Sequence, residues 1–191
     1  FMPGAIARLT KAHPKLYPSL HTGPASFLVP RIGDGTVEFG IFFHVPASVT
    51  DDVIVKPIKK VPFRLVGAKR AVDKNDVEVL SAFIGSREID SPDTRTYPTL
   101  GMLRKRYTWA SSRFSSDQLA VRRQLALQGA GVAILPEFLV QTDIKQGRLK
   151  DVLPKEKFAF DLKLVQHKLR PLSVAAQALF SGIEQEIDTV I

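Results

Sequence analysis

One stretch decides the fold: Gln128-Gly129-Ala130-Gly131-Val132-Ala133-Ile134-Leu135-Pro136. Gly129 ends a preceding helical pattern, because glycine readily adopts the left-handed conformation that follows many helices. The apolar run over 131–135 then predicts a short buried strand. Pro136 predicts the first turn of another helix, over 136–144, and Gln146-Gly147 is a turn signal. A helix, a strand and a second helix in this order are typical of an α/β protein.

The same signals alternate on both sides of this stretch. Before it, we expect helices over 3–12 and 24–32, strands over 16–22, 37–42, 53–55, 62–66 and 82–85, and a polar loop over 68–76. Nearer to it, we expect a turn at 90–93, a helix over 97–106, a strand over 107–112 and a helix that begins at Ser115-Ser116-Asp117. After it, we expect a strand over 158–166 and a last helix capped by Ser173. This alternation predicts an α/β sandwich with mostly parallel sheets.

The composition is that of an ordinary globular protein. The chain has 191 residues, of which 45% are apolar and 24% are charged, and this suffices for one sizeable domain or two small lobes. Its apolar runs are shorter than the ~20 residues of a membrane span, and residues 1–5 carry no signal-peptide pattern. The sequence contains no cysteine, which excludes disulfides, thiolate metal sites and cysteine nucleophiles.

The net charge of +8 favours an anionic partner. The basic residues are nevertheless spread along the chain, as at Lys59-Lys60, Arg104-Lys105-Arg106 and Arg122-Arg123. Three interpretations therefore stay open: a solvated surface, the attraction of a small anion, and direct binding of DNA.

The sequence does not favour an enzyme or a metalloprotein. Histidines 13, 21, 44 and 167 lack metal-ligand spacing, and we expect each of them in a turn or at the surface. A Gly-x-Ser-x-Gly nucleophile elbow and a phosphate-binding loop are both missing from the sequence. Gly129-Ala130-Gly131 begins like a dinucleotide-binding fingerprint, but Ile134 occupies the third glycine position and the segment leads into a strand. We therefore expect no cofactor, no metal and no catalytic residue.

The decisive stretch has a continuation that strengthens its identification. After 128–136 come Glu137-Phe138-Leu139-Val140, Gly147-Arg148-Leu149 and Val152-Leu153-Pro154. Together they closely resemble the "G-x-G-I/V-A-x-L-P … G-x-L … L" segment in the effector-sensing domain of LysR-type bacterial transcription regulators. Four further parts resemble the family in the same order: 9–14 its first helix, Gly23 with 35–41 a glycine and its strand, 57–66 the strand toward the second lobe, and 170–180 the last helix. The resemblance covers nearly the whole chain.

Three departures from the family pattern stand out. Glu38 and Gly40 stand where the family often has Asp and Ala. The family's first sheet strand is expected before Phe1, and the turn after that strand commonly contributes a Ser or Thr to the ligand. The family's N-terminal helix-turn-helix domain and its linker helix are absent from this chain.

The resemblance implies a fold like that of the type-2 periplasmic binding proteins, with two Rossmann-like α/β lobes joined by two crossing strands. Lobe I is then expected at 1–66 plus 164–191, lobe II at 67–163, and a small effector in the cleft between the lobes. The resemblance also implies a cytoplasmic bacterial regulator with no membrane partner. This domain is expected to form an antiparallel homodimer and the full-length protein a homotetramer, with DNA bound only through the missing N-terminal domain.

Candidate effector contacts follow from a general rule for open parallel sheets. Ligands bind beyond the carboxyl ends of the strands, where helix N-termini offer free N–H groups and a partial positive charge. The residues at such positions are Thr22, Gly23, Pro24, Phe42, Phe43, Ser86, Arg87, Ser115 and Ser116. Arg87 is the best partner for an anion, because a guanidinium matches the geometry of a carboxylate. The serines have an alternative role as helix caps, the phenylalanines as core residues and Arg87 as a solvated surface residue.

We therefore expect a regulatory domain that senses a small, carboxylate-bearing metabolite and is not an enzyme. A transport-type solute-binding protein would share the fold, and a signal peptide would favour it. The Gly-x-Gly-Val-Ala-Ile-Leu-Pro stretch favours the regulator. A third hypothesis is an enzyme on the same scaffold, which requires a cleft with paired titratable groups of perturbed pKa.

Overall fold

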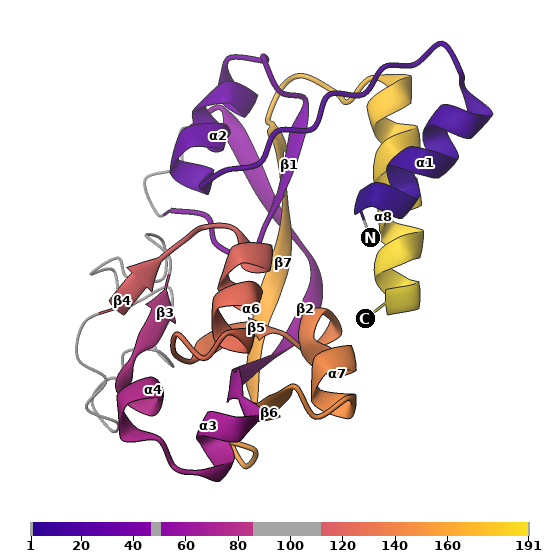
Figure 1. The fold of residues 1–191 in the computed structure, drawn as a ribbon. Coiled ribbons are helices and arrows are strands. Elements are labelled where there is room, and N and C mark those ends of the chain that lie inside the picture. The colour runs from indigo at the N-terminus through magenta and orange to yellow at the C-terminus, as the bar shows by residue number, and fades with distance from the viewer. Residues whose placement is uncertain (1, 47–50, 86–111, 191) are drawn as a thin grey trace. The chain divides into compact units, whose positions relative to one another are not determined.

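The computed structural model describes residues 2–46, 51–85 and 112–190. The chain divides into two compact units, unit 1 with residues 1–59 and 162–191 and unit 2 with residues 60–161. Strands β2 (Val53–Ala68) and β7 (Phe158–His167) each run from one unit into the other, and they are neighbours in the strand order (Figure 1). From the sequence, the two boundaries were expected after residues 66 and 163.

The described residues of unit 1 form three helices, one short strand and parts of the two long strands. Its own elements are α1 (Met2–Ala12), α2 (Ala25–Gly33), β1 (Phe39–Phe42) and α8 (Val174–Val190). Strand β1 is antiparallel to β7, with Phe39 opposite Gln166 and Phe42 opposite Lys163. The expected helix over 3–12 and the last helix are confirmed. Ser173 caps the latter, because its hydroxyl accepts from the backbone N–H of Ala176 at 3.1 Å.

Two apolar clusters hold unit 1 together. Helix α1 lies against α8, and its buried residues Ala5 and Leu9 are one helical turn apart, as are Ile183 and Ile187 on α8 (Figure 1). The second cluster joins α2 to β2 and β7, and its fully or largely buried members are Ala25, Val29, Ile32, Val45, Val53 and Val165. Each fully buried valine or isoleucine side chain contributes about 1.5–3 kcal/mol to stability.

Unit 2 contains short helices and short strands. The elements among its described residues are α3 (Lys69–Asp73), α4 (Val77–Ser81), β3 (Phe83–Gly85), β4 (Ser112–Ser115), α6 (Leu119–Leu127), β5 (Ala133–Pro136), α7 (Glu137–Lys145) and β6 (Leu149–Asp151). Strand β2 pairs antiparallel with both β5 and β6, whereas β3 and β4 pair in parallel. Phe83 and Val132 form a further parallel bridge.

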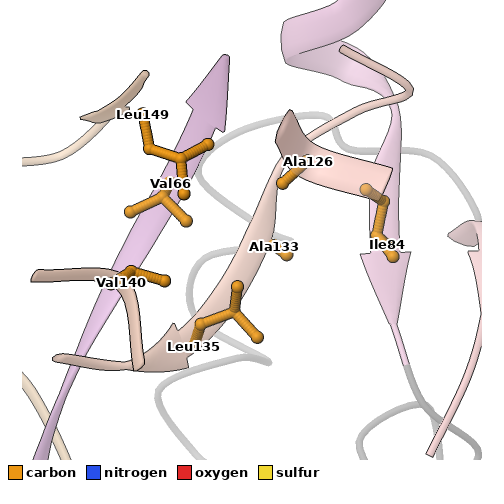
Figure 2. Packing of buried hydrophobic residues seen from close by; sticks show 7 residues of the cluster. All are labelled: Val66, Ile84, Ala126, Ala133, Leu135, Val140 and Leu149. Atoms are coloured by element: carbon orange, nitrogen blue, oxygen red, sulfur yellow. The ribbon is translucent and has the colours of Figure 1, made fainter. Parts of the chain in front are cut away.

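The core of unit 2 is built around the stretch that the sequence singled out. Figure 2 shows seven buried side chains from β2, β3, α6, β5, α7 and β6 that pack together: Val66, Ile84, Ala126, Ala133, Leu135, Val140 and Leu149. Helices α6 and α7 both contact β5. The short apolar strand is therefore enclosed, which explains why its sequence is a continuous apolar run and not an alternating one.

Two glycines in this stretch are required for different reasons. Gly129 has φ +79°, the left-handed conformation that ends α6, and the N–H of Ala130 donates to the carbonyl of Leu125 at 3.0 Å. At Gly131 the reason is space. A Cβ built there would lie 2.2 Å from the carbonyl oxygen of Ala82, so only glycine lets the chain before β3 approach this closely. The approach is secured by Val132 N–H, which donates to the same Ala82 oxygen at 2.8 Å.

Two local predictions are wrong. Residues 16–22 form no strand, because Pro18 cannot donate a ladder hydrogen bond and the apolar Tyr17 and Leu20 are 91% and 51% exposed. The polar segment 68–76 is not a loop throughout, since Lys69–Asp73 forms α3. A salt bridge between Lys69 and Asp73, four residues apart, supports this single turn.

The expectation of mostly parallel sheets is also wrong for the described strands. The pairs β1–β7, β2–β5 and β2–β6 are all antiparallel, because β2 and β7 are long strands that carry the chain between the units. The strands expected over 53–55 and 62–66 are likewise parts of the single strand β2. The turn at 90–93, the helix over 97–106 and nearly all of the strand over 107–112 lie outside the described residues.

Candidate functional site

The first group of candidate residues precedes α2 in unit 1. Thr22 and Gly23 are exposed, and Pro24 is the N-cap of α2. The Pro24 carbonyl accepts from the backbone N–H groups of Phe27 and Leu28, at 3.0 and 3.1 Å, so the first turn is closed by backbone bonds without a side-chain cap. The positive end of the α2 dipole therefore lies beside exposed Thr22, an arrangement suited to an anion.

Phe42 and Phe43 stand at the carboxyl end of β1, and both are half-buried. Phe42 packs against the cluster of α2, β2 and β7, so it has the core role that was its alternative interpretation. The next residue, His44, is only 6% exposed. The expectation that each histidine lies in a turn or at the surface is therefore wrong for His44, which is followed by the buried Val45 of the same cluster.

The second group lies in unit 2, where two parallel strands end together. Ser115 is the last residue of β4 and is opposite Gly85, the last residue of β3. The backbone N–H of Ser116 donates to the Gly85 carbonyl at 3.0 Å. The structure thus brings Ser115 and Ser116 to the end of the strand that Ser86 and Arg87 follow in the sequence. Ser86 and Arg87 themselves lie outside the described residues.

The two serines differ from their expected role as the start of a helix. Helix α6 begins only at Leu119, with Gln118 as its N-cap and no side-chain cap. Ser116 is half-buried, and its hydroxyl accepts from the Gln118 N–H at 3.3 Å, which shapes the turn into the helix. Ser115 is exposed at the strand end, and it is the serine of this pair that is available to a ligand.

A buried carboxylate in unit 2 is the feature that sequence reasoning missed. Asp143 on α7 is 0% exposed, and two guanidinium groups reach it. Arg123 of α6 binds both carboxylate oxygens, with Nε–Oδ2 2.6 Å and Nη2–Oδ1 2.8 Å. Arg148, in the turn before β6, adds Nη2–Oδ1 at 2.5 Å. This network joins the middle of α6 to the end of α7 and satisfies a charge that water does not reach.

A second arginine network in unit 2 lies along β2. Arg64 forms paired bonds of 3.2 Å to both oxygens of Glu137 and a third, of 3.3 Å, to Asp151. The hydrogen bond to Glu137, followed by the charges of Glu137 and Asp151, raises the pKa of Arg64 above its ordinary value, so this side chain remains cationic. All three side chains are part-exposed, and the network links β2, α7 and β6 structurally.

The described residues contain no group of three or more His, Cys, Asp or Glu side chains placed to hold a metal ion. Within the same residues, no helix is long and apolar enough to cross a membrane. The charge is unequal between the units. Unit 2 contains 18 basic and 12 acidic residues, a net +6, whereas unit 1 contains 9 and 7, a net +2.

A sequence model described as the LysR substrate binding domain matches residues 1–187. Solved structures of similar fold include the apo regulatory domain of HypT from Salmonella typhimurium, with 16% identity and a TM-score of 0.69 over 100% of this chain and 92% of that one. The regulatory domain of CrgA, a LysR-type transcriptional regulator from Neisseria meningitidis, has 16% identity and a TM-score of 0.71 over 97% and 91%.

The regulatory domain of CcmR from Synechocystis PCC6803, solved with 2-PG, has 11% identity and a TM-score of 0.71 over 97% of this chain and 90% of that one. No curated protein sequence matches the chain. The α/β fold class and the family resemblance, both expected from the sequence, are confirmed.

Proposed function

The chain belongs to the LysR substrate-binding domain family, and from this premise we propose that it senses a small anionic effector on behalf of a LysR-type bacterial transcription regulator. The observation that carries the proposal is the family match over residues 1–187, in a chain that divides into two compact units. Effector binding would shift the balance between two states of the domain, and the regulator's DNA-binding domain would respond to that shift.

The proposed effector carries a carboxylate or a similar anionic group. The exposed Thr22 beside the α2 N-terminus and the exposed Ser115 at the end of β4 support this chemistry, because hydroxyls and helix N-termini both favour anions. The net charges of +2 and +6 on the two units would attract such a ligand. The HypT regulatory domain, which has a similar fold, has been solved with bromide bound.

We place the effector contacts at Thr22, Gly23 and Pro24 in unit 1 and at Ser86, Arg87, Ser115 and Ser116 in unit 2. Phe42 and Phe43 would shape the apolar side of the site. The proposal keeps the family expectation that one effector is held by residues of both units. It also keeps a cytoplasmic location, a homodimer of this domain and a homotetramer of the full-length regulator. A transport-type solute-binding protein stays second, because the matching family model is that of the regulators.

A thermal-unfolding screen of small carboxylates tests the proposal. A ligand at 100 times its Kd adds about 2.7 kcal/mol of stability, which raises the midpoint by several degrees in a domain of this size. We expect at least one aliphatic or aromatic carboxylate to do so. If every carboxylate leaves the midpoint unchanged, the anionic effector is wrong.

Two pairs of variants then locate the site. Thr22→Val and Ser115→Ala remove one hydroxyl each, and both positions are exposed. Thr142→Val and Ser181→Ala remove the same groups from exposed positions on α7 and α8. We expect the first pair to reduce the ligand-induced shift and the second pair to preserve it. An equal shift in all four variants would exclude Thr22 and Ser115 from the site.

A further inference from the structure

The turn that follows β7 in unit 1 is held by hydrogen bonds and not by apolar burial. Lys168, Leu169, Arg170 and Pro171 are all exposed, and the apolar Leu169 is 84% exposed. Val174, at the start of α8, is also 84% exposed. Because so little apolar surface is buried here, the polar contacts decide whether this segment is ordered.

His167, the last residue of β7, supplies the central contact. Its Nδ1 accepts two backbone hydrogen bonds, from the N–H of Leu169 at 3.0 Å and from the N–H of Arg170 at 2.9 Å. An imidazole nitrogen accepts only through a free lone pair, so Nδ1 carries no proton and the ring proton is on Nε2. The neutral ring therefore fixes the direction in which the chain leaves β7.

Arg170 links this turn to the end of α2 through its guanidinium group. Its Nη2 donates to the Gly33 carbonyl at 2.9 Å and its Nη1 to the Asp34 carbonyl at 3.1 Å, so the guanidinium holds the carboxyl end of the helix. Gly35 leaves the space for it, since a Cβ at Gly35 would lie 1.6 Å from Nη1. One short turn thus connects the end of β7 to the end of α2.

We propose that this turn is a proton-sensitive junction, formed while His167 is neutral and opened when His167 takes up a proton. A proton on Nδ1 replaces the lone pair that both N–H groups use, so one protonation removes two hydrogen bonds and leaves two backbone donors facing a cation. Opening the turn then releases Arg170 from the end of α2. The inference is independent of the identity of the effector.

Other charged and polar groups lie around the turn and are engaged in contacts of their own. Asp34 keeps its charge, because the hydroxyl and backbone N–H of Thr36 hold the pKa of its carboxyl below the ordinary value. Glu38 accepts from the Ser173 N–H at 3.1 Å, and the Asp52 carbonyl accepts from the Lys168 N–H at 2.7 Å. Carboxylates ordinarily titrate near pH 4 and lysine and arginine above pH 10, whereas histidine takes up its proton near pH 6.5. We therefore expect the turn to be formed while the His167 ring is neutral and to open once the ring is protonated.

The test compares the wild type with His167→Asn and His167→Ala at pH 8 and pH 5.5. Asparagine offers an oxygen that accepts from backbone N–H groups two and three residues ahead and does not titrate, whereas alanine has no acceptor. The first readout is the ¹⁵N chemical shift of both ring nitrogens, which distinguishes a protonated nitrogen from a bare one. At pH 8 we expect Nδ1 of His167 to carry no proton.

The second readout is the exchange of the Leu169 and Arg170 amide protons, corrected for the intrinsic effect of pH. We expect the wild type to lose about tenfold in protection between pH 8 and pH 5.5, because two hydrogen bonds are lost and each contributes a factor of about three. His167→Asn is expected to keep its protection at both pH values, and His167→Ala to lack it at both. A proton on Nδ1 at pH 8, or equal protection of the wild type and His167→Ala at pH 8, would overturn the proposal.

Discussion

In each unit, arginine side chains bind near the carboxyl end of a helix, but the group they bind is exposed in unit 1 and buried in unit 2. In unit 1, Arg170 holds the end of α2 through two backbone carbonyls at an exposed turn. In unit 2, Arg123 and Arg148 hold the end of α7 through Asp143, whose side chain is wholly buried. Arg170 thus meets the negative end of a helix dipole, whereas Arg123 and Arg148 meet a carboxylate near a helix end. Removing the cations leaves an unpaired charge away from water only in unit 2. We therefore expect burial to decide how much each arginine contact contributes to stability.

The largest expected effect is the loss of both partners of Asp143. The double variant Arg123→Met/Arg148→Met keeps the apolar stems and leaves a buried carboxylate without a cation, which costs about 3–5 kcal/mol in the free energy of unfolding. Urea denaturation of the purified chain measures it. The triple variant that adds Asp143→Leu removes the unpaired buried charge and should regain part of the lost free energy of unfolding. A loss below about 1 kcal/mol in the double variant would show that Asp143 is solvated in solution.

The next largest effect is expected when Gly131 of unit 2 and Gly182 of unit 1 are each replaced by alanine. Gly131→Ala places a Cβ 2.2 Å from the backbone oxygen of Ala82, which cannot move without disturbing β3, and it should cost about 1–3 kcal/mol. Gly182→Ala in α8 meets only Ala5, at 3.7 Å, and should stabilise by about 0.5–1 kcal/mol, because alanine is the better helix former. Thermal unfolding of both variants measures this difference. Equal midpoints would refute the close approach at Gly131.

The exposed contact of Arg170 with the end of α2 should contribute less to stability than the Asp143 network or the close approach at Gly131. Arg170→Met removes two hydrogen bonds to carbonyls that water can reach, so we expect a loss of about 0.5–1 kcal/mol. The same urea denaturation measures it, with Lys168→Met as the control for a lost surface cation. If Arg170→Met lowers the free energy of unfolding as much as Arg123→Met/Arg148→Met does, burial does not decide the strength of these two arginine contacts.

The smallest effect is expected at Asp73, an exposed carboxylate between two lysines. Hydrogen bonds from Lys150 and then Lys69 hold the pKa of the Asp73 carboxyl below its ordinary value. A lowered carboxyl pKa stabilises the fold above about pH 4 and ceases to do so as the pH falls through the folded-state value. Asp73→Asn should therefore be slightly less stable than the wild type at pH 7 in low salt, and no different in high salt or near pH 2. A salt-independent loss would contradict a purely surface interaction.

The two regions also differ in how far the sequence alone predicts them. Around 128–154, apolar runs and glycine turns agree, and the strand β5 and the helix α7 lie within one or two residues of the prediction. Over 16–22, the apolar residues Tyr17 and Leu20 remain exposed, and the local sequence does not reveal that no partner strand covers them. Local patterns predict elements, whereas pairing depends on what the rest of the chain brings near.

The same limit applies to the polar residues. Asp143 and Arg123 are 20 residues apart, on two helices that meet only after folding, so their pairing has no local signature. The bond between Ser116 and Gly85 is equally non-local. Helix-cap chemistry is local, and Ser173 was accordingly predicted correctly. The positions of candidate effector contacts follow from strand ends, but which of them bind a ligand is a question of chemistry that remains a prediction.

The most direct test of the regulatory account is a calorimetric titration of the carboxylate that stabilises the chain best. Thr22 and Ser115 belong to different units, and our proposal is that both contact one effector. We therefore expect one effector per chain, a loss of about 3–10-fold in affinity for Thr22→Val and for Ser115→Ala, and a larger loss when the two are combined. Unchanged affinity in the double variant, with the Thr142→Val/Ser181→Ala control equally unchanged, would contradict it.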